Sequence, residues 1–420
     1  MLLILLIVIV GLVYLFSMQG ITCCNSGSLY ALVRAIVEKR TFKINKYIGY
    51  TKHMDYAKVG KNLYSDRPPG LAFAAVPFYA LGIKNITIVS VISGVLASVM
   101  TYLITFHFVE SSLIAFSVAL IFALCTINWR YSTTFIIHPL SVFLVLLSVY
   151  WFLSGYPVFF VGLILGFATI VEYTDFLYFF GILIYEFVFN NLNTVPFLAV
   201  GYIIGVLPLF YYNKVCFGSA FVTSYKYSAY FKWSNSFETT FVNPISKGIF
   251  GLLFHIKKKG KMSIPGGILV TSPVLIFGMI GFVFFDFKDL ILFLLLAVPI
   301  FLIMSKHKTW WAGGGGDHRY LISMLGFIVI PIGLFLANVG LWGLILFWAI
   351  ISFAMMLVKM AVLTITSKDQ KELEKKKGSE KLKALISLIL SGVFIRKINL
   401  EKCDPEVACK EIEKRNKEGE

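Results

Sequence analysis

The sequence predicts an all-α, polytopic membrane protein with about 11 to 12 transmembrane helices and a long first loop that carries interfacial helices. Hydrophobic residues make up 58% of the 420 residues and charged residues only 14%, and the mean hydropathy is +0.82. A soluble domain is about half apolar and about one quarter charged. The composition therefore excludes an ordinary soluble enzyme or binding domain.

The expected spans follow from a window of about 20 residues, the length that a helix needs to cross the hydrocarbon core. They are residues 2–18, 86–108, 112–127, 138–154, 157–172, 175–190, 195–212, 267–285, 288–304, 320–337 and 340–363. The first run has no basic segment and ends near Cys23-Cys24-Asn25, a poor signal-peptide cleavage site, so we interpret it as a retained span. Residues 71–83 are apolar but short, which predicts a re-entrant or surface-lying helix.

The order of these spans places four polar segments on one face of the membrane, provided that residues 71–83 do not cross. The first to fourth polar segments are residues 19–70, 128–137, 213–266 and 305–319. With the amino terminus in the cytoplasm, this face is extracytoplasmic, and the first extracytoplasmic loop covers residues 19–85. The lysine-rich stretch 257–261 then contradicts the positive-inside rule. Either it binds an anionic lipid phosphate on the outside, or the span count is wrong by one.

Two parts of the chain differ in composition. Residues 1–366 form the predicted transmembrane domain, and residues 367–420 form a charged tail whose apolar stretch, 384–395, predicts an interfacial helix or a short last span. The net charge is +16, and its basic residues lie in loops and in the tail. This distribution predicts lipid head groups and phosphates as partners and no nucleic acid. The six cysteines lack metal-ligand spacing, and we assign them no chemistry.

The most informative motif is Tyr64-Ser65-Asp66-Arg67-Pro68-Pro69-Gly70. It places two opposite charges and a rigid turn at the start of an apolar segment. A polar insertion of this kind at a bilayer surface usually has a function. The alternative is that Asp66 and Arg67 form an interfacial ion pair that only shapes the turn.

The order of several motifs resembles the integral-membrane glycosyltransferases of the family C fold. The resemblance is to the branch of the protein mannosyltransferases and lipid A aminoarabinose transferases, and most of all to its uncharacterised prokaryotic members. It covers residues 1 to about 340, and it depends on the order of the motifs rather than on any single one. The motifs are Asn25–Ile36, Thr51–Ala57, Asn62–Gly70, Trp129–Ser132 with His138, Val171–Tyr173, Tyr212–Gly218, Gly266–Pro273, and Trp310-Trp311 followed by Asp317–Leu321.

The resemblance implies transfer of a sugar from a polyprenyl-phosphate-linked donor to a glycan, lipid or protein acceptor at the outer face of the plasma membrane. A carboxylate of the first loop would take a proton from the acceptor, and cations would stabilise the phosphate that leaves. Many relatives carry an acid just after the first span, where this chain has Cys24-Asn25-Ser26. Because an amide is not a base at neutral pH, the predicted catalytic base is Asp55 or, second, Asp66.

The other candidate site residues are chosen for their charge, their hydrogen-bonding groups or their aromatic rings. Arginine binds phosphate as a bidentate fork and lysine as a point charge. The predicted phosphate- or donor-binding residues are Arg67, Arg130, Lys257, Lys258, Lys259 and Arg319. The predicted substrate-binding residues are Tyr64, Trp129, His138, Trp310, Trp311 and Asp317.

Several of these residues have a structural alternative. Trp310 and Trp311 could belong to an aromatic belt at the membrane surface, and His138 could only satisfy a backbone carbonyl. Glu172 and Asp175 lie at a span boundary, where we expect them to be structural.

No cofactor is predicted with certainty. A divalent cation would suit such an enzyme, but the sequence has no tight acidic cluster to hold one. The alternative function is a transporter or flippase for a lipid-linked or small anionic substrate, which would also need cations near the membrane. Transporters tend to have duplicated halves and helices broken at Gly or Pro. The sequence has no visible internal repeat, which favours the transferase.

Overall fold

The structure is a computed structural model that describes residues 1–189, 192–259, 262–311, 316–362, 378–391 and 393. Apart from two short hairpins and two isolated bridges, its regular structure is helical. By length and composition, five helical segments of the described part can cross a membrane. They are Thr87–Val109 (α4), Val195–Phe217 (α10), Phe287–Lys306 (α15), Arg319–Val339 and Trp342–Ala361.

Every predicted span contains helix in the structure. The other single helices are Leu2–Phe16 (α1), Ser112–Leu124 (α5), His138–Leu153 (α7), Val158–Val171 (α8), Phe176–Phe189 (α9) and, to its full length, Trp342–Val362 (α18). Two predicted spans consist of several helical pieces. These are Ile268–Thr271 (α13), Pro273–Leu275 (η5), Ile276–Gly281 (α14) and Phe282–Phe284 (η6), and then Arg319–Leu321 (η8), Ile322–Val329 (α16) and Pro331–Val339 (α17). Proline, which lacks a backbone N–H, begins a new piece at Pro273 and Pro331.

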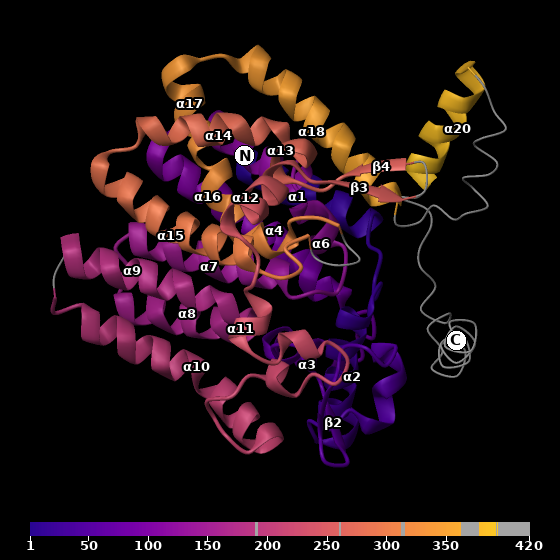
Figure 1. The fold of residues 1–420 in the computed structure, drawn as a ribbon. Coiled ribbons are helices and arrows are strands. Elements are labelled where there is room, and N and C mark those ends of the chain that lie inside the picture. Colours follow the sequence, from indigo (N-terminus) through magenta and orange to yellow (C-terminus); the bar gives the residue numbers. More distant parts are fainter. Residues whose placement is uncertain (190–191, 260–261, 312–315, 363–377, 392, 394–420) are drawn as a thin grey trace.

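The long helices lie side by side, and α8 packs against both α7 and α10 (Figure 1). Glycine allows the α8–α10 contact to be close. A Cβ on Gly162 would lie 2.1 Å from the carbonyl oxygen of Leu198, and one on Gly201 would lie 2.0 Å from that of Phe159. Small residues that let helix backbones approach are a common means of helix association in membranes, where apolar side chains gain little from leaving lipid.

The first polar segment folds into a compact unit at one end of these helices (Figure 1). It contains Cys24–Lys39 (α2), Asn45–Thr51 (η1), a hairpin of Ala57–Val59 (β1) and Asn62–Tyr64 (β2), and the start of Gly70–Ala80 (α3). The strands are antiparallel, with Ala57 opposite Tyr64. Glu38 of α2 accepts hydrogen bonds from Arg34, Tyr47 and Tyr79, which joins α2 to η1 and α3.

The remaining polar segments contain short elements. The second holds Asn128–Ser132 (α6). The third holds Ser224–Tyr227 (η3), Lys232–Ser234 (η4), Phe237–Thr240 (α11), Ile245–Phe254 (α12), Ile256–Lys259 (β3) and Met262–Pro265 (β4). In the predicted tail, Gly378–Leu390 (α20) is helical and contacts α18. Residues 367–377 and most of the stretch after α20 lie outside the described residues.

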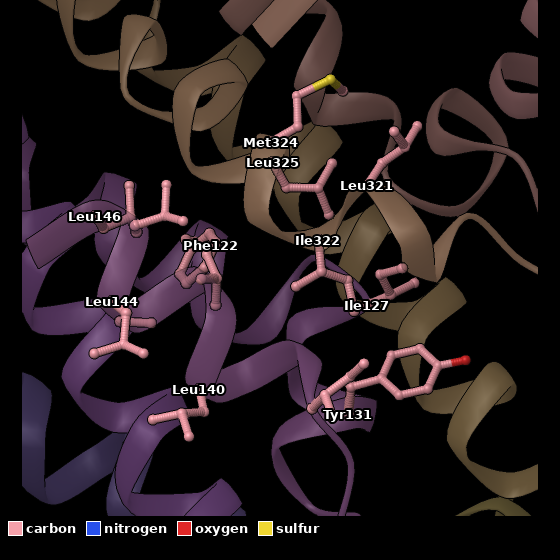
Figure 2. Packing of buried hydrophobic residues seen from close by; sticks show 14 of the residues in the cluster. Phe122, Ile127, Tyr131, Leu140, Leu144, Leu146, Leu321, Ile322, Met324 and Leu325 are labelled. Atoms are coloured by element: carbon pink, nitrogen blue, oxygen red, sulfur yellow. The ribbon is translucent and has the colours of Figure 1, made fainter. Parts of the chain in front are cut away.

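A hydrophobic core fills the space between α5, α7 and α16. Figure 2 shows Phe122, Leu140 and Leu146 on one side and Leu321, Ile322 and Leu325 on the other. The hydroxyl group of Tyr131 points away from Leu140 and Leu144 in the same view. This core therefore supports a polar group at its edge, in the second polar segment.

Candidate active site

The four polar segments form a closed cycle of contacts. The first meets the second where Gly20 and Thr134 form a bridge, and the second meets the fourth through an Arg130–Asp317 ion pair of 2.7 Å. The fourth meets the third where Lys308 N donates to the carbonyl oxygen of Thr240 at 2.7 Å. The third returns to the first where Ser228 Oγ donates to Asp66 Oδ2 at 2.9 Å. The segments that the span order assigns to one face therefore meet.

The charged side chains at these contacts form two clusters, which we call the acidic half and the basic half of the candidate site. The acidic half consists of Asp55, Asp66 and Arg67. Arg67 pairs with Asp55 through Nη2, and its Nε lies 3.1 Å from Asp66 Oδ1, although these two atoms are not aligned for a hydrogen bond. The side chains of Asp55 and Asp66 are 4% and 1% exposed, and that of Arg67 is 16% exposed. One guanidinium thus lies between two carboxylates, with a small part of its surface open.

A tight turn presents Asp55 to this half. Lys52 and His53 both have positive φ angles, 50° and 53°, a region that few non-glycine residues adopt. Thr51 Oγ1 accepts a hydrogen bond from His53 N at 3.1 Å, which supports the turn. Backbone outliers of this kind concentrate at functional sites. Asp55 also interacts electrostatically with Cys24, and burial together with Asp55 raises the pKa of that thiol. Asp55 therefore lies beside the Cys24-Asn25-Ser26 stretch.

Asp66 and Arg67 are held by a turn of their own. Ser65 Oγ accepts a hydrogen bond from Arg67 N at 3.1 Å and lies 2.8 Å from Ser28 Oγ of α2. Gly70 then brings the motif against the end of α8, because a Cβ there would lie 2.7 Å from Val171 N. Backbone atoms cannot move aside easily, so glycine is required at this position. The motif fixes the acidic half to the helical bundle.

Burial dominates the chemistry of Asp66. It raises the pKa of this carboxyl from 3.8 to about 6, against the attraction of Arg67 and with a smaller contribution from the negative charge of Asp55. The third polar segment covers the group, with Ser224 Oγ 2.8 Å from the Asp66 carbonyl oxygen. Tyr225 places its ring 5.5 Å from the Arg67 guanidinium. Asp66 thus joins the first and third segments and holds Arg67.

The basic half consists of Arg130, Asp317, Arg319 and Lys359. Asp317 Oδ2 accepts from Arg130 at 2.7 Å and lies 3.7 Å from Lys359 Nζ. Tyr131 OH also lies 2.9 Å from the same oxygen. Burial alone would raise the pKa of Asp317, but the positive charges of Lys359, Arg130 and Arg319 outweigh it and hold the pKa below its usual range. Asp317 is therefore ionised and central to three cations.

Arg319 differs from the other cations of the basic half. Its Nε is buried, and its side chain makes no hydrogen bond or close ion pair with any described residue. Its guanidinium lies 5.4 Å from the ring of Tyr320. The residue as a whole is half-buried, and a cation removed from water in this way is costly unless an anion, here a ligand, balances its charge. Within the described part of the chain, Arg319 is the group best suited to an incoming anion.

Tyr320 joins the two halves. Its ring lies 5.4 Å from the Arg319 guanidinium of the basic half, and it is also close to Arg67 of the acidic half. His138 lies beside it, with ring centroids 6.3 Å from Tyr320 and 5.5 Å from Tyr131. His138 Nδ1 is also 3.3 Å from Glu172 Oε2. The structure thus brings together Asp55, Asp66, Arg67, Arg130, His138, Asp317 and Arg319 from the predicted set.

The predicted aromatic residues are placed differently. Trp129 is fully buried, stacks on Phe353 and donates its indole N–H to Ser17 Oγ at 2.9 Å. Tyr64 and Trp310 are also buried. Trp310 packs edge to face with half-buried Trp311, at 5.2 Å between ring centroids. Since their rings are largely covered by protein, these four residues support the walls of the site, and we do not carry them into the proposal as sugar contacts.

The predicted lysines Lys257, Lys258 and Lys259 form strand β3. Their side chains lie outside the described residues, so their assignment to phosphate stays a prediction. Among the described residues, no group of three His, Cys, Asp or Glu side chains could hold a metal ion.

Sequence reasoning did not name Lys359, and it expected a structural role for Glu172, although both residues lie at this site. Lys359 is the single charged residue of the last apolar span, and an ionisable side chain inside a span is itself a sign of function. Glu172 follows α8 directly. The span order that selects the four polar segments also places the short connection after residue 172 on the same face, so the same argument would have included Glu172.

A cavity of about 620 Å³ lies away from these residues. Phe152, Tyr156, Tyr185, Glu186 and Phe197 contribute to its lining, at the α7–α8 and α9–α10 connections. Glu186 is its one acidic residue, and Thr194 donates a hydrogen bond to it. The described residues of the lining are mostly apolar and include no cation, so we assign the cavity no part in the chemistry.

The fold is similar to that of two solved structures. ArnT from Cupriavidus metallidurans bound to undecaprenyl phosphate superposes with a TM-score of 0.61 and 13% sequence identity, over 96% of this chain and 74% of ArnT. The apo state of the same protein gives a TM-score of 0.55 and 14% identity, over 87% of this chain and 66% of ArnT. No protein-family model and no curated protein matches the chain. The structural likeness confirms the predicted family C membrane glycosyltransferase fold.

Proposed function

We propose that the chain is a glycosyltransferase of the plasma membrane, which moves a sugar from a polyprenyl-phosphate-linked donor to an acceptor at the outer face. The observation that carries the proposal is that a carboxylate-rich half and a cation-rich half meet at Tyr320, whose ring lies 5.4 Å from the Arg319 guanidinium and is also close to Arg67. The similarity to a structure that contains undecaprenyl phosphate supports the donor class. Fold alone does not specify a reaction, so the charged groups carry the argument.

The acidic half supplies the base. The acceptor oxygen attacks the anomeric carbon of the sugar, and Asp55 takes the proton that this oxygen loses. Arg67 holds the Asp55 carboxylate in place, and Asp66 holds Arg67 from the other side. Asp66 is the more deeply buried of the two acids, and its carboxylate already accepts a hydrogen bond from Ser228. We therefore assign catalysis to Asp55 and positioning to Asp66.

The basic half receives the leaving group. As the bond between the anomeric carbon and the phosphate oxygen breaks, its electron pair passes to that oxygen, and the lipid phosphate gains negative charge. Arg319, which lacks a paired anion among the described residues, is suited to bind this phosphate directly. Arg130 and Lys359 add positive charge nearby while Asp317 fixes their positions. Cations arranged in advance for developing charge are a main source of catalysis.

The test uses the purified full-length protein in lipid nanodiscs, with polyprenyl-phosphate-linked sugars and a membrane extract as acceptor. Asp55→Asn should lower the transfer rate by about 10² to 10⁴-fold, the usual effect of losing a general base. Glu186→Gln is the matched control, because it removes a buried carboxylate far from the site. Full activity of Asp55→Asn would overturn the assignment. In proteoliposomes, which enclose a compartment, movement of the donor lipid across the bilayer without transfer would support the transporter alternative instead.

The sugar and the acceptor can be identified in cells. Mass spectrometry of lipids and surface glycans, with and without the gene, should show the loss of one hexose or pentose unit. Its disappearance would name the donor sugar, and the molecule that lacks it would name the acceptor.

A further inference from the structure

We propose that Glu172 and His138 bind hydroxyl groups of the sugar that is transferred, and so determine which sugar the site accepts. This inference rests on the proposed function. It concerns the middle of the site, between the base and the phosphate-binding cations, where the proposed function assigns no residue and where the sequence predicts only that His138 binds substrate. It gives a binding role to an acid that the sequence indicates as structural.

The position of the sugar follows from the two halves. During transfer the anomeric carbon lies between the attacking oxygen, which is near Asp55, and the phosphate oxygen, which is near Arg319. The sugar ring must therefore lie between the halves. Tyr320 marks this middle position because its ring lies 5.4 Å from the Arg319 guanidinium and is also close to Arg67. His138 lies beside Tyr320, with 6.3 Å between ring centroids.

Glu172 reaches the same place from α8. It is the residue after Val171, where the helix ends and the backbone becomes extended. It interacts electrostatically with Tyr225, the residue that covers Arg67. Gly70 contacts the backbone of Ile170 and Val171, so the Asp66-Arg67 motif lies against the end of the helix that carries Glu172. Glu172 is thus adjacent to the acidic half and to His138.

The Glu172 side chain has an unused acceptor. Its Oε2 atom is buried and makes no hydrogen bond with a described residue, although His138 Nδ1 is 3.3 Å away, because the geometry is not that of a hydrogen bond. The side chain as a whole is 17% exposed, so it is not sealed in the core. Buried polar atoms are normally satisfied, and an unsatisfied one indicates a missing donor. A ligand that occupies the middle of the site would supply it.

Sugar hydroxyls match this need. An ionised carboxylate only accepts hydrogen bonds, and its two oxygens can accept from two neighbouring hydroxyl groups. Imidazole adds one further nitrogen that can donate or accept, according to its protonation. The titratable groups close to Glu172 are Asp175, Tyr173, Tyr178 and Tyr225, and those in ring contact with His138 are Tyr131 and Tyr320. A site built to hydrogen-bond a hydroxyl strongly rejects an analogue that lacks it, because its own polar groups are then unpaired.

The test compares sugars that differ by one hydroxyl. The purified protein is first assayed with polyprenyl-phosphate-linked hexoses (glucose, mannose and galactose) and pentoses (arabinose, 4-aminoarabinose and xylose), and then with the monodeoxy analogues of the sugar that it transfers. The wild type should lose at least about 10-fold in kcat/KM with one or two of the analogues. Glu172→Gln should lose about 10- to 100-fold with the parent sugar, yet stay within about 3-fold of the wild type with those analogues. Glu186→Gln, at the opposite end of the bundle, should behave as the wild type with every sugar.

Other outcomes separate the two proposals. Equal losses of Glu172→Gln with the parent and all analogues would overturn the inference, and so would full activity. If Glu172→Gln does not fold, as judged by its thermal unfolding, Glu172→Asp keeps the charge on a shorter side chain and must change the ranking of the analogues. An unchanged ranking would also overturn it. A wild type that transfers none of the sugars, with a membrane extract as acceptor, would instead contradict the proposed function.

Discussion

The acidic and the basic half use the same construction with the charges reversed. In the acidic half one cation, Arg67, lies between two carboxylates, whereas in the basic half one carboxylate, Asp317, lies among three cations. With all groups ionised, the net charge of these residues is −1 in the acidic half and +2 in the basic half. The central ion of each half is held in ion pairs, whereas the net charge left in each half is available for proton transfer or phosphate binding. Structure and reactivity are therefore assigned to different members of each cluster.

Removing the central ion of the basic half should have the largest effect. Asp317→Asn removes the ion-pair partner of Arg130 and Lys359, and losing one partner of a buried ion pair costs about 3–5 kcal/mol. We expect the free energy of unfolding to fall by about that amount, measured by thermal or denaturant unfolding in detergent. Asp317→Glu, which keeps the charge, should recover part of the loss. An unchanged melting temperature in Asp317→Asn would mean that the cations do not depend on Asp317.

The contact of the acidic half with the helices can be tested at Gly70. In Gly70→Ala the new Cβ would lie 2.7 Å from Val171 N, so the motif and α8 must move apart. Overpacking of this kind costs about 1–3 kcal/mol, and transfer activity should fall because Asp66 and Arg67 move with the motif. Gly343→Ala is the matched control, since a Cβ there meets nothing within 4 Å. Equal stability of the two variants would argue against the close approach.

Substitution of Arg319 should weaken donor binding without lowering the stability of the protein. Because it has no ion pair with a described residue, Arg319→Ala should weaken donor binding by about 10- to 100-fold, equal to the loss of a charge-assisted hydrogen bond of about 1.5–3 kcal/mol. The melting temperature should change little. Arg130→Ala should instead lower both affinity and stability, because it also removes the partner of Asp317. Titration with polyprenyl phosphate measures the affinity. Equal destabilisation of the two variants would contradict the different roles assigned to Arg319 and Arg130.

The smallest effect concerns the pH dependence of stability at Asp66. Its folded pKa of about 6 lies above the ordinary 3.8, so between these values the folded protein holds a proton that the unfolded chain releases. The free energy of unfolding should therefore fall as pH rises through this window. Asp66→Asn removes this contribution. The melting temperature of the variant minus that of the wild type should rise between about pH 4 and 6, and a flat difference would contradict the raised pKa.

The helices were the most predictable part of the molecule. Long apolar runs determine where a chain crosses a bilayer, since unpaired backbone groups are excluded from it, and α4 and α15 begin within one residue of the predicted starts. The sequence also gives the positions of the prolines, but it did not show that the helix predicted over residues 267–285 is interrupted at Pro273. The two hairpins were not predicted, because their strands have three or four residues and no clear alternation.

The site was predictable in its charges but not in their partners. The motif around Asp66 and the two arginines Arg130 and Arg319 were found, because charged residues are rare in this chain and stand out. Which acid pairs with which cation depends on contacts between segments that are far apart in sequence, such as Arg130 and Asp317. For the same reason the sequence could not show that Trp129 turns into the core.

The cyclic order of the four polar segments has a mechanical consequence. A linear row of contacts could peel apart from either of its ends, one junction after another. A cycle has no such end, because every segment is anchored on both sides, at Gly20–Thr134, Arg130–Asp317, Lys308–Thr240 and Ser228–Asp66. Breaking one junction leaves the other three still connecting all four segments. Separating the polar segments to admit a bulky acceptor therefore requires two junctions to break together.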